Sequence, residues 1–71
     1  MKVRAVVAKN LRKMRHAEGV SQEELAARAD IDRNYVGYIE REKHGATIDM
    51  LEKLAGALGV KVKDFFETDA D

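Results

Sequence analysis

The stretch SQEELAARADIDRNYVGYIER, Ser21 to Arg41, decides the fold. It contains two short segments in which apolar residues recur with helical spacing, separated by about three residues. Ser21 and Asp32 each stand directly before one segment, where a side-chain oxygen can accept a hydrogen bond from the first turn of a helix. The stretch therefore predicts two short helices, at about residues 22–29 and 33–41, joined by a tight turn.

The rest of the chain shows the same helical spacing and no strand signal. Apolar residues predict one helix at residues 3–18, and another that begins after the candidate cap Thr47 and ends at Gly59. The following segment VKVKDFFE allows a short fifth helix, and residues 68–71 are expected to fray. The sequence thus predicts an all-α, compact five-helix domain at residues 1–67.

The composition argues against several classes of protein. The chain has 71 residues, no cysteine and no proline, and 37% of its residues are charged, which suits one small helical bundle. Its apolar runs are too short to span a membrane and no secretory signal is visible, so we expect a cytoplasmic protein. His16 and His44 lack partners at a metal-ligand spacing, so no metal or cofactor is expected. No nucleophile–base pattern is present, so we expect no enzyme.

Charge is distributed unevenly, although the formal net charge is zero. Residues 1–16 carry six Lys and Arg and no acid, whereas residues 46–71 carry six acids and three lysines. This polarity has two readings, either ordinary solvated helix faces or one face that meets phosphate. The neutral total removes the usual argument that a basic chain binds nucleic acid.

The second helix of the short pair has two different faces on a helical wheel. Val36 and Ile39 fall together on one side. The opposite side is an arc of hydrogen-bonding side chains around a glycine. Two short helices joined by a tight turn are the helix-turn-helix arrangement of DNA-binding proteins, whose second helix enters the major groove. The arc consists of Arg33, Asn34, Gly37, Tyr38 and Arg41, with Tyr35 at its edge.

The arc suits the major groove of DNA. Arg33 and Asn34 occupy the first turn, the end of a recognition helix that meets base edges. Arginine can bind guanine through two hydrogen bonds, and asparagine can bind adenine in the same way. Gly37 costs about 1 kcal/mol relative to alanine inside a helix, so we interpret it as allowing a close approach of the backbone. The alternative is an ordinary surface helix with solvated polar residues.

The segment LRKMRHAEGVSQEELAARADIDRNYVGYIEREKHGATIDMLEKLAGALGVKVKDFF resembles the lambda-repressor-like (Xre-type) helix-turn-helix family. The similarity extends over about residues 6–66, and the form DRxY within IDRNYVGYIER is especially similar to the controller proteins of restriction–modification systems. The resemblance implies a transcriptional regulator that binds double-stranded operator DNA, usually as a symmetric dimer. The residues it implies for base contact are Arg33, Asn34, Tyr35 and Tyr38.

The resemblance also implies contacts to the DNA backbone. An ion pair common in the family is matched by Arg15 and Glu40, and its expected role is to aim the arginine at a phosphate. The alternative is a surface salt bridge worth about 0–1 kcal/mol. The residues implied for phosphate contact are Arg15, Gln22, Arg41 and Lys43.

Three positions depart from the family pattern. Glu42 stands where a glycine often ends the recognition helix, so either the helix continues or Glu42 bears a conformational cost. HGAT replaces a common Asn-Pro, so Gly45 is expected to take over the turn. Lys61 stands where a cap such as serine is usual before the fifth helix.

A homodimer is expected because one such domain reaches only a few base pairs. The adjacent Phe65 and Phe66 would point about 100° apart on a helix, so they cannot enter the same core pocket. We expect one in the core and the other in a two-fold interface with Leu58 or Val60, or else both partly buried within the monomer. The alternative partner is a protein, bound by an antitoxin or adaptor that uses the same scaffold.

Overall fold

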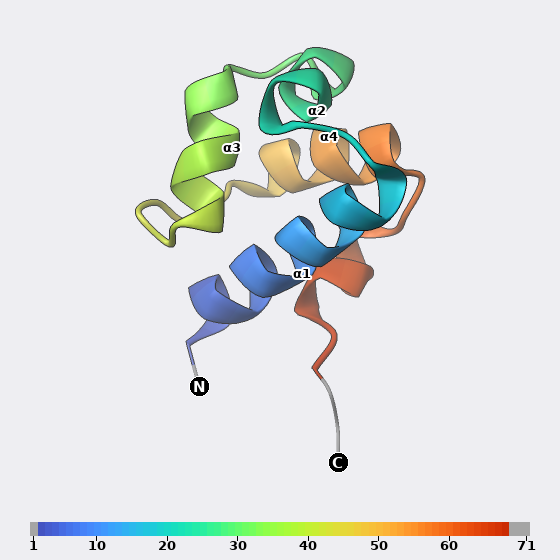
Figure 1. Cartoon of the computed structure of the whole chain (residues 1–71). Coiled ribbons are helices and arrows are strands. Elements are labelled where there is room, and N and C mark those ends of the chain that lie inside the picture. The colour runs from blue at the N-terminus through green and yellow to red at the C-terminus, as the bar shows by residue number, and fades with distance from the viewer. Residues whose placement is uncertain (1, 69–71) are drawn as a thin grey trace.

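The computed structural model describes residues 2–68, a bundle of helices packed around one core (Figure 1). Within these residues there is no strand, and the expected all-α architecture is confirmed. Of the predicted frayed tail at 68–71, all but Thr68 lies outside the described residues. The elements are α1 (Val3–Glu18), α2 (Gln22–Ala29), α3 (Arg33–Glu40), α4 (Ile48–Leu58) and the 3-10 helix η1 (Val62–Phe66).

Helices begin at the polar residues identified in the sequence. The side-chain oxygens of Ser21, Asp32 and Thr47 accept hydrogen bonds from first-turn N–H groups at 3.0, 2.7 and 3.1 Å. Such a cap stabilises a helix by about 0.5–2 kcal/mol. At the other ends, Gly19 and Gly59 stop α1 and α4 in the left-handed conformation, at φ 68° and 70°. Local chemistry therefore sets most of the boundaries.

The turn between α2 and α3 depends on Asp30, which is left-handed at φ 57°. Its N–H donates to the carbonyl of Ala27 at 3.2 Å, and the N–H of Ile31 donates to that of Ala26 at 3.0 Å. Aspartate tolerates this conformation better than most residues other than glycine. The two bonds close the turn and direct the chain into α3.

Every element contributes one large, fully buried side chain to the core. These side chains have no exposed surface and interlock across α1 to η1. Figure 1 shows α1 running beneath α3 and α4, with α2 above them. This packing supports the inner side of α3 and leaves its outer side clear. The five residues are Leu11, Leu25, Val36, Leu54 and Phe65.

The fifth helix is a 3-10 helix rather than an α-helix. The carboxylate of Asp64 accepts a hydrogen bond from the Lys61 N–H at 3.0 Å, and the Asp64 N–H donates to the Lys61 carbonyl at 2.9 Å. These two bonds close the start of η1 without a serine-like side-chain cap. The Asn10 side-chain amide on α1 donates to the carbonyls of Phe65 and Glu67 at 2.7 and 2.8 Å. η1 is thereby fastened to α1.

The loop after α3 resolves the question raised by Glu42. The helix stops, and Glu42 adopts the left-handed conformation at φ 60°. The N–H of Lys43 donates to the carbonyl of Tyr38 at 2.8 Å, which completes the helix end. The prediction that Gly45 takes over the turn is wrong, because the glycines with positive φ in residues 2–68 are Gly19 and Gly59.

Candidate nucleic-acid interface

The first turn of α3 holds the two side chains selected for base contact. The carboxylate of Asp32 accepts a hydrogen bond from the Asn34 N–H at 2.7 Å, which fixes the start of the helix. Arg33 and Asn34 are both exposed, while Val36 in the same turn is fully buried. The helix therefore presents a guanidinium and an amide outward from a well-packed inner side.

Two tyrosines and a histidine form an aromatic cluster beside this turn. Tyr35 is 42% exposed, so it belongs to the surface. The rings of Tyr35 and Tyr38 meet edge to face with centroids 6.4 Å apart, and the ring of His44 lies 4.9 Å from that of Tyr38. Such a pair contributes about 0.5–1.5 kcal/mol beyond its burial. The cluster connects α3 to the loop that follows it.

Gly37 is buried, although Arg33 and Arg41 on the same arc are exposed. The guanidinium of Arg41, one turn later, covers it, and a Cβ at position 37 would lie 3.2 Å from Arg41 Nη1. The same guanidinium lies 5.6 Å from the centre of the Tyr38 ring, a cation–π distance. The glycine therefore makes room for an arginine of its own helix. Close approach of DNA to its backbone requires Arg41 to move first.

Glu40, the last residue of α3, joins three helices. Its two carboxylate oxygens accept hydrogen bonds from Arg15 Nε at 2.7 Å and Nη2 at 3.0 Å, which makes a two-point ion pair. Gln22 Nε2 donates to the same carboxylate at 3.0 Å. The backbone carbonyl of Glu40 accepts a hydrogen bond from Arg12. Side chains of α1 and α2 thus fix the end of α3.

The ion pair changes the acidity of both partners. Burial raises the pKa of Glu40, but hydrogen bonds from Arg15 and Gln22 and the charges of Arg15 and Arg12 outweigh it. The net result is a pKa below the ordinary value of 4.5. The hydrogen bond to Glu40 raises the pKa of Arg15, against the effect of burial. Both groups are therefore charged at neutral pH.

The contact between Arg15 and Glu40 implied by the resemblance is present, and the structure shows how the arginine is held. The Arg15 side chain is 12% exposed, and its Nη1 donates to the carbonyl of Val20 at 3.0 Å. Gln22 is half-buried with one amide N–H on Glu40. Because both side chains are already ordered, a phosphate bound there would pay little further side-chain entropy. Their phosphate contacts stay predictions.

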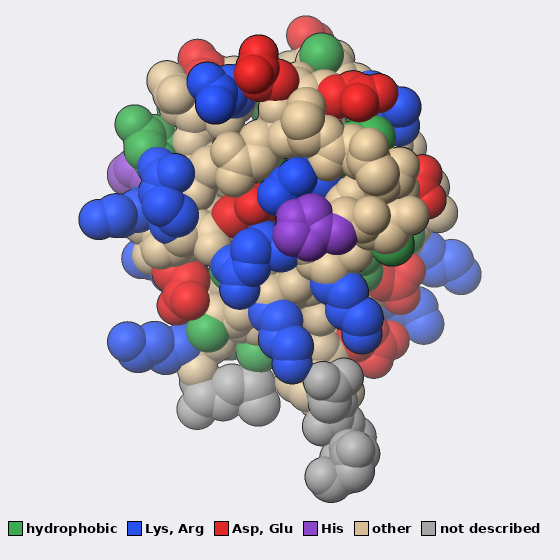
Figure 2. Space-filling view, viewed as in Figure 1, with side chains coloured by type: hydrophobic (Ala, Val, Ile, Leu, Met, Phe, Trp, Pro, Cys, Tyr) green, Lys and Arg blue, Asp and Glu red, His purple; other side chains and the backbone are tan. Residues whose placement is uncertain are grey.

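Arg41 and Lys43 both lie exposed at and after the end of α3. Glu42 stands between them and is also exposed. In Figure 2, Lys and Arg side chains gather over α1 and beside the loop after α3, whereas Asp and Glu side chains gather over α2. The outer arc of α3, from Arg33 to Arg41, therefore borders a basic region of the surface.

The residues predicted for a two-fold interface divide between core and surface. Phe65 is fully buried and Leu58 is 6% exposed, because both fill the core of the monomer. Neither offers surface to a second chain, which corrects their inclusion in the interface. Phe66 is 44% exposed and Val60 is half-buried. Phe66 and the exposed Val3 of α1 line a pocket of about 110 Å³.

Arg12 is a residue of this site that was not predicted from the sequence. Its contact with the Glu40 carbonyl makes it a second tie between α1 and the end of α3. The available signal is its spacing, because Arg12 and Arg15 are three residues apart and share one side of a helix. Within residues 2–68, no cluster of His, Cys, Asp and Glu could hold a metal ion, and no helix could cross a membrane.

A family model described as helix-turn-helix matches residues 11–65, which include all of α2, α3 and α4. The chain belongs to the helix-turn-helix family. A hypothetical transcription factor from Neisseria meningitidis serogroup B is 47% identical over 58 residues, covering 82% of this chain and 55% of that protein. This chain thus spans about half of that relative's length. Control protein C.BamHI from Bacillus amyloliquefaciens is 35% identical over 66 residues, covering 92% of this chain and 82% of that protein.

Solved structures agree with the family. The Neisseria transcription factor has a TM-score of 0.91 at 40% identity, with 96% of this chain and 78% of that chain covered. The restriction–modification controller protein C.AhdI from Aeromonas hydrophila has a TM-score of 0.85 at 36% identity, covering 89% of this chain and 96% of that one. A mutant of C.Esp1396I bound to its operator site has a TM-score of 0.81 at 33% identity, covering 90% and 84%. The expected fold and similarity to controller proteins are confirmed.

Proposed function

We propose that this chain is a sequence-specific DNA-binding transcriptional regulator that acts in the cytoplasm and reads a palindromic operator as a homodimer. The observation that carries the proposal is the outer arc of α3. The inner side of α3 is packed on the core through Val36 and Ile39, and the end of α3 is tied to α1 and α2 through Glu40. A helix held in this way can present Arg33 and Asn34 to base edges in a fixed orientation.

Base reading is assigned to the exposed side chains of the arc. Arg33 can donate two hydrogen bonds to O6 and N7 of guanine, and Asn34 can pair with the edge of adenine. Tyr35 and Tyr38 can add contacts to neighbouring bases through their hydroxyl groups and ring edges. A relative of similar fold, a C.Esp1396I mutant, is described in complex with its operator, which supports this use of the scaffold.

Phosphate binding is assigned to side chains around the arc. Arg15 and Gln22 are ordered by Glu40, and Arg41 and Lys43 are exposed beyond the end of α3. Each cation that neutralises a phosphate releases counterions, so these residues make affinity dependent on salt. They fix the position of the protein on the duplex, while the arc supplies the specificity.

A homodimer has two recognition helices, which together can bind the two half-sites of a palindrome. Symmetric dimers place their recognition helices about 34 Å apart, or at a multiple of that spacing. Phe66, an apolar side chain of η1, is 44% exposed, which supports an interface at η1. Phe66 is the interface residue that we retain, with the half-buried Val60 nearby in the chain.

An antitoxin or adaptor that binds a partner protein is the second candidate function. It is favoured by the zero formal net charge and by Ile48, an exposed apolar residue at the start of α4. It predicts little affinity for DNA at any salt concentration, whereas a DNA reader loses affinity steeply as salt rises.

The test is in vitro selection of binding sites from a random DNA pool at a stated salt concentration. We expect enrichment of a palindrome, and its half-site spacing will give the geometry of the dimer. A folded protein that enriches no sequence would overturn the proposal and favour the adaptor. A single enriched half-site would retain DNA reading and remove the homodimer.

A further inference from the structure

Arg4, near the start of α1, reaches the loop that follows the recognition helix. A Cβ at Gly45 would lie 3.2 Å from Arg4 Nε and 3.5 Å from Nη2, so the guanidinium rests on the bare backbone of that glycine. Figure 1 shows the start of α1 below the end of this loop. Gly45 does not have a positive φ, so a glycine is not needed there for backbone conformation. The absence of a side chain instead leaves space for a neighbouring group. It makes room for Arg4, as Gly37 makes room for Arg41.

The position of Arg4 is electrostatically unfavourable for α1. Arg4 lies in the first turn of α1, which contains no acidic residue, and the partial positive charge of a helix N-terminus disfavours a cation there. Within residues 2–68 it makes no hydrogen bond or ion pair, although Arg15 and Arg28 both do. The side chain is exposed, and its charge therefore remains available to an external anion.

The contact adds a third cation to the loop. Arg41 and Lys43 belong to the segment that follows α3, and Arg4 belongs to the start of α1. Glu42 is the exposed acid between the two loop cations, but Arg4 forms no ion pair with it. A guanidinium binds a phosphate group through two parallel N–H donors, which a lysine cannot do.

We propose that Arg4 binds a DNA backbone phosphate beside those bound by Arg41 and Lys43, and that Gly45 is the seat that positions its guanidinium. The inference rests on the proposed DNA-binding function and extends it to the start of α1. It assigns one further phosphate contact to each protomer. Specificity for base sequence is unaffected, because phosphate contacts position the protein without reading bases.

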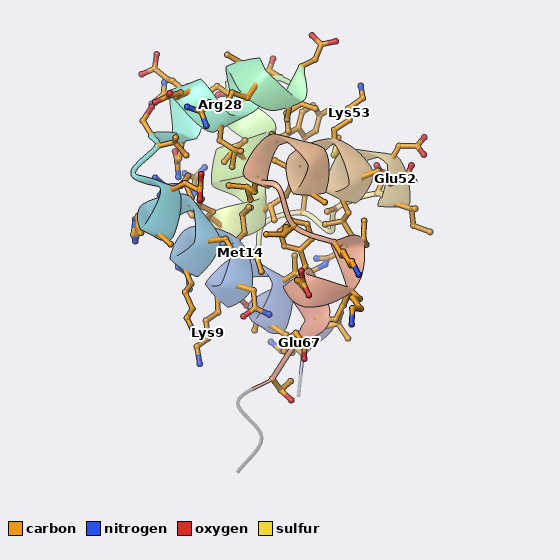
Figure 3. The ribbon with its side chains drawn as sticks, turned by 90° about the vertical axis from the view of Figure 1, so that its right-hand side faces the viewer. Lys9, Met14, Arg28, Glu52, Lys53 and Glu67 are labelled. Carbon is orange, nitrogen blue, oxygen red and sulfur yellow. The ribbon has the colours of Figure 1, made fainter. Side chains whose placement is uncertain are left out.

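The experiment compares the salt dependence of DNA affinity between variants of the full chain. Wild type, Arg4→Ala and Lys53→Ala are titrated against a labelled duplex carrying the sequence enriched by selection, at several salt concentrations. Lys53 is the matched control, because Figure 3 shows it on the outer side of α4 and α3 lies on the far side in that view. Thermal unfolding and sedimentation are measured for each variant.

Arg4→Ala is expected to lower the slope of log K against log salt by about 0.9 for each protomer. Lys53→Ala should keep the wild-type slope, and Arg4→Lys should restore the slope but only part of the affinity. Gly45→Ala should weaken binding less than Arg4→Ala, because a Cβ at 3.2 Å displaces the guanidinium without removing it.

Two outcomes separate the inference from the proposed function. If wild type shows no salt-dependent binding, the DNA-binding function and the inference both fail. If wild type binds and Arg4→Ala matches Lys53→Ala in slope, only the inference fails. A lower affinity with an unchanged slope and more monomer in sedimentation would instead assign Arg4 to the dimer, and would also overturn it.

Discussion

The carboxylate of Glu40 accepts two hydrogen bonds from Arg15, from Nε to Oε2 at 2.7 Å and from Nη2 to Oε1 at 3.0 Å. This ion pair joins the end of α3 to α1. The Glu40 side chain is 3% exposed and that of Arg15 is 12% exposed, so solvent screens the pair only weakly. Removal of one partner from such a pair leaves a buried charge uncompensated. The pair therefore matters for stability as well as for the orientation of α3.

Acid should weaken the fold through Glu40. The pKa of this carboxyl is lower in the folded chain than its ordinary value of 4.5, which we take for the unfolded chain. A lowered folded-state pKa gives stability that is present above 4.5 and is lost as pH falls through the folded-state value. We expect the free energy of unfolding, measured by urea titration, to fall in that acidic window. Glu40→Gln should be less stable at neutral pH and lose less on acidification.

An equal acid loss in wild type and Glu40→Gln would assign the effect to another carboxylate. The exposed pair Arg28–Glu24 offers a control, because its side chains are 45% and 49% exposed. Glu24→Gln should change stability by only about 0–1 kcal/mol.

Gly37→Ala should separate stability from DNA binding. Alanine in a helix interior is more stable than glycine by about 1 kcal/mol, so the midpoint of thermal unfolding should rise. The new Cβ would lie 3.2 Å from Arg41 Nη1 and displace that guanidinium, a flexible group that can move at little cost. We expect weaker binding to the selected operator, measured by fluorescence anisotropy, because the Cβ displaces Arg41 and hinders close approach of DNA to the backbone at position 37.

Gly56→Ala is the matched control for that variant. Gly56 is an exposed glycine in α4, and a Cβ there would meet nothing within 4 Å. It should gain similar stability and leave DNA affinity unchanged. If Gly37→Ala bound the operator as tightly as wild type, the gap at Gly37 would have no part in recognition.

Glu42→Gly should improve both stability and DNA affinity. Glu42 is left-handed at φ 60°, a conformation that costs a non-glycine residue roughly 1–2 kcal/mol. Glycine removes that strain and also a negative charge beside the predicted phosphate contacts Arg41 and Lys43. Asp30→Gly relieves a similar φ of 57° in the turn before α3 and serves as the comparison for stability. A DNA affinity of Glu42→Gly equal to that of wild type would exclude an electrostatic role of Glu42.

Arg33→Ala should weaken operator binding by about 1–3 kcal/mol and relax specificity at one base pair. The physical reason is the loss of two hydrogen bonds to a guanine edge. Binding to the selected operator and to single-base variants of it will measure the effect. Equal weakening on every sequence would reassign Arg33 to a phosphate.

Phe66→Ser should shift the protein from dimer to monomer in sedimentation at micromolar concentration. The side chain is 44% exposed and lies outside the core that Phe65 fills, so the monomer should keep its fold by circular dichroism. An unchanged dimer would place the interface elsewhere on the surface.

Helix boundaries were predictable because local groups set them. Ser21, Asp32 and Thr47 each bond the turn that follows them, and these bonds need no distant partner. The short segment after Lys61 was harder, since its five residues form a 3-10 helix whose end is held by Asn10, far away in the chain. Such a tertiary hydrogen bond leaves no periodic signal.

The candidate site was predictable in its residues but less in its contacts. The wheel placed Arg33 and Asn34 outward because helical spacing alone decides that. The covering of Gly37 by Arg41 and the rest position of Arg4 on Gly45 depend on how long, flexible side chains fold back on their surroundings. Composition and spacing do not specify those conformations.

The position of Phe65 has a consequence for folding during synthesis on the ribosome. It is the last of the five fully buried large side chains, and its carbonyl accepts a hydrogen bond from Asn10, which was synthesised 55 residues earlier. The first helices emerge from the ribosome with no partner for this part of their apolar surface. The core is complete only after Phe65 has left the exit tunnel, so the whole bundle must emerge before the end of α3 is held in place.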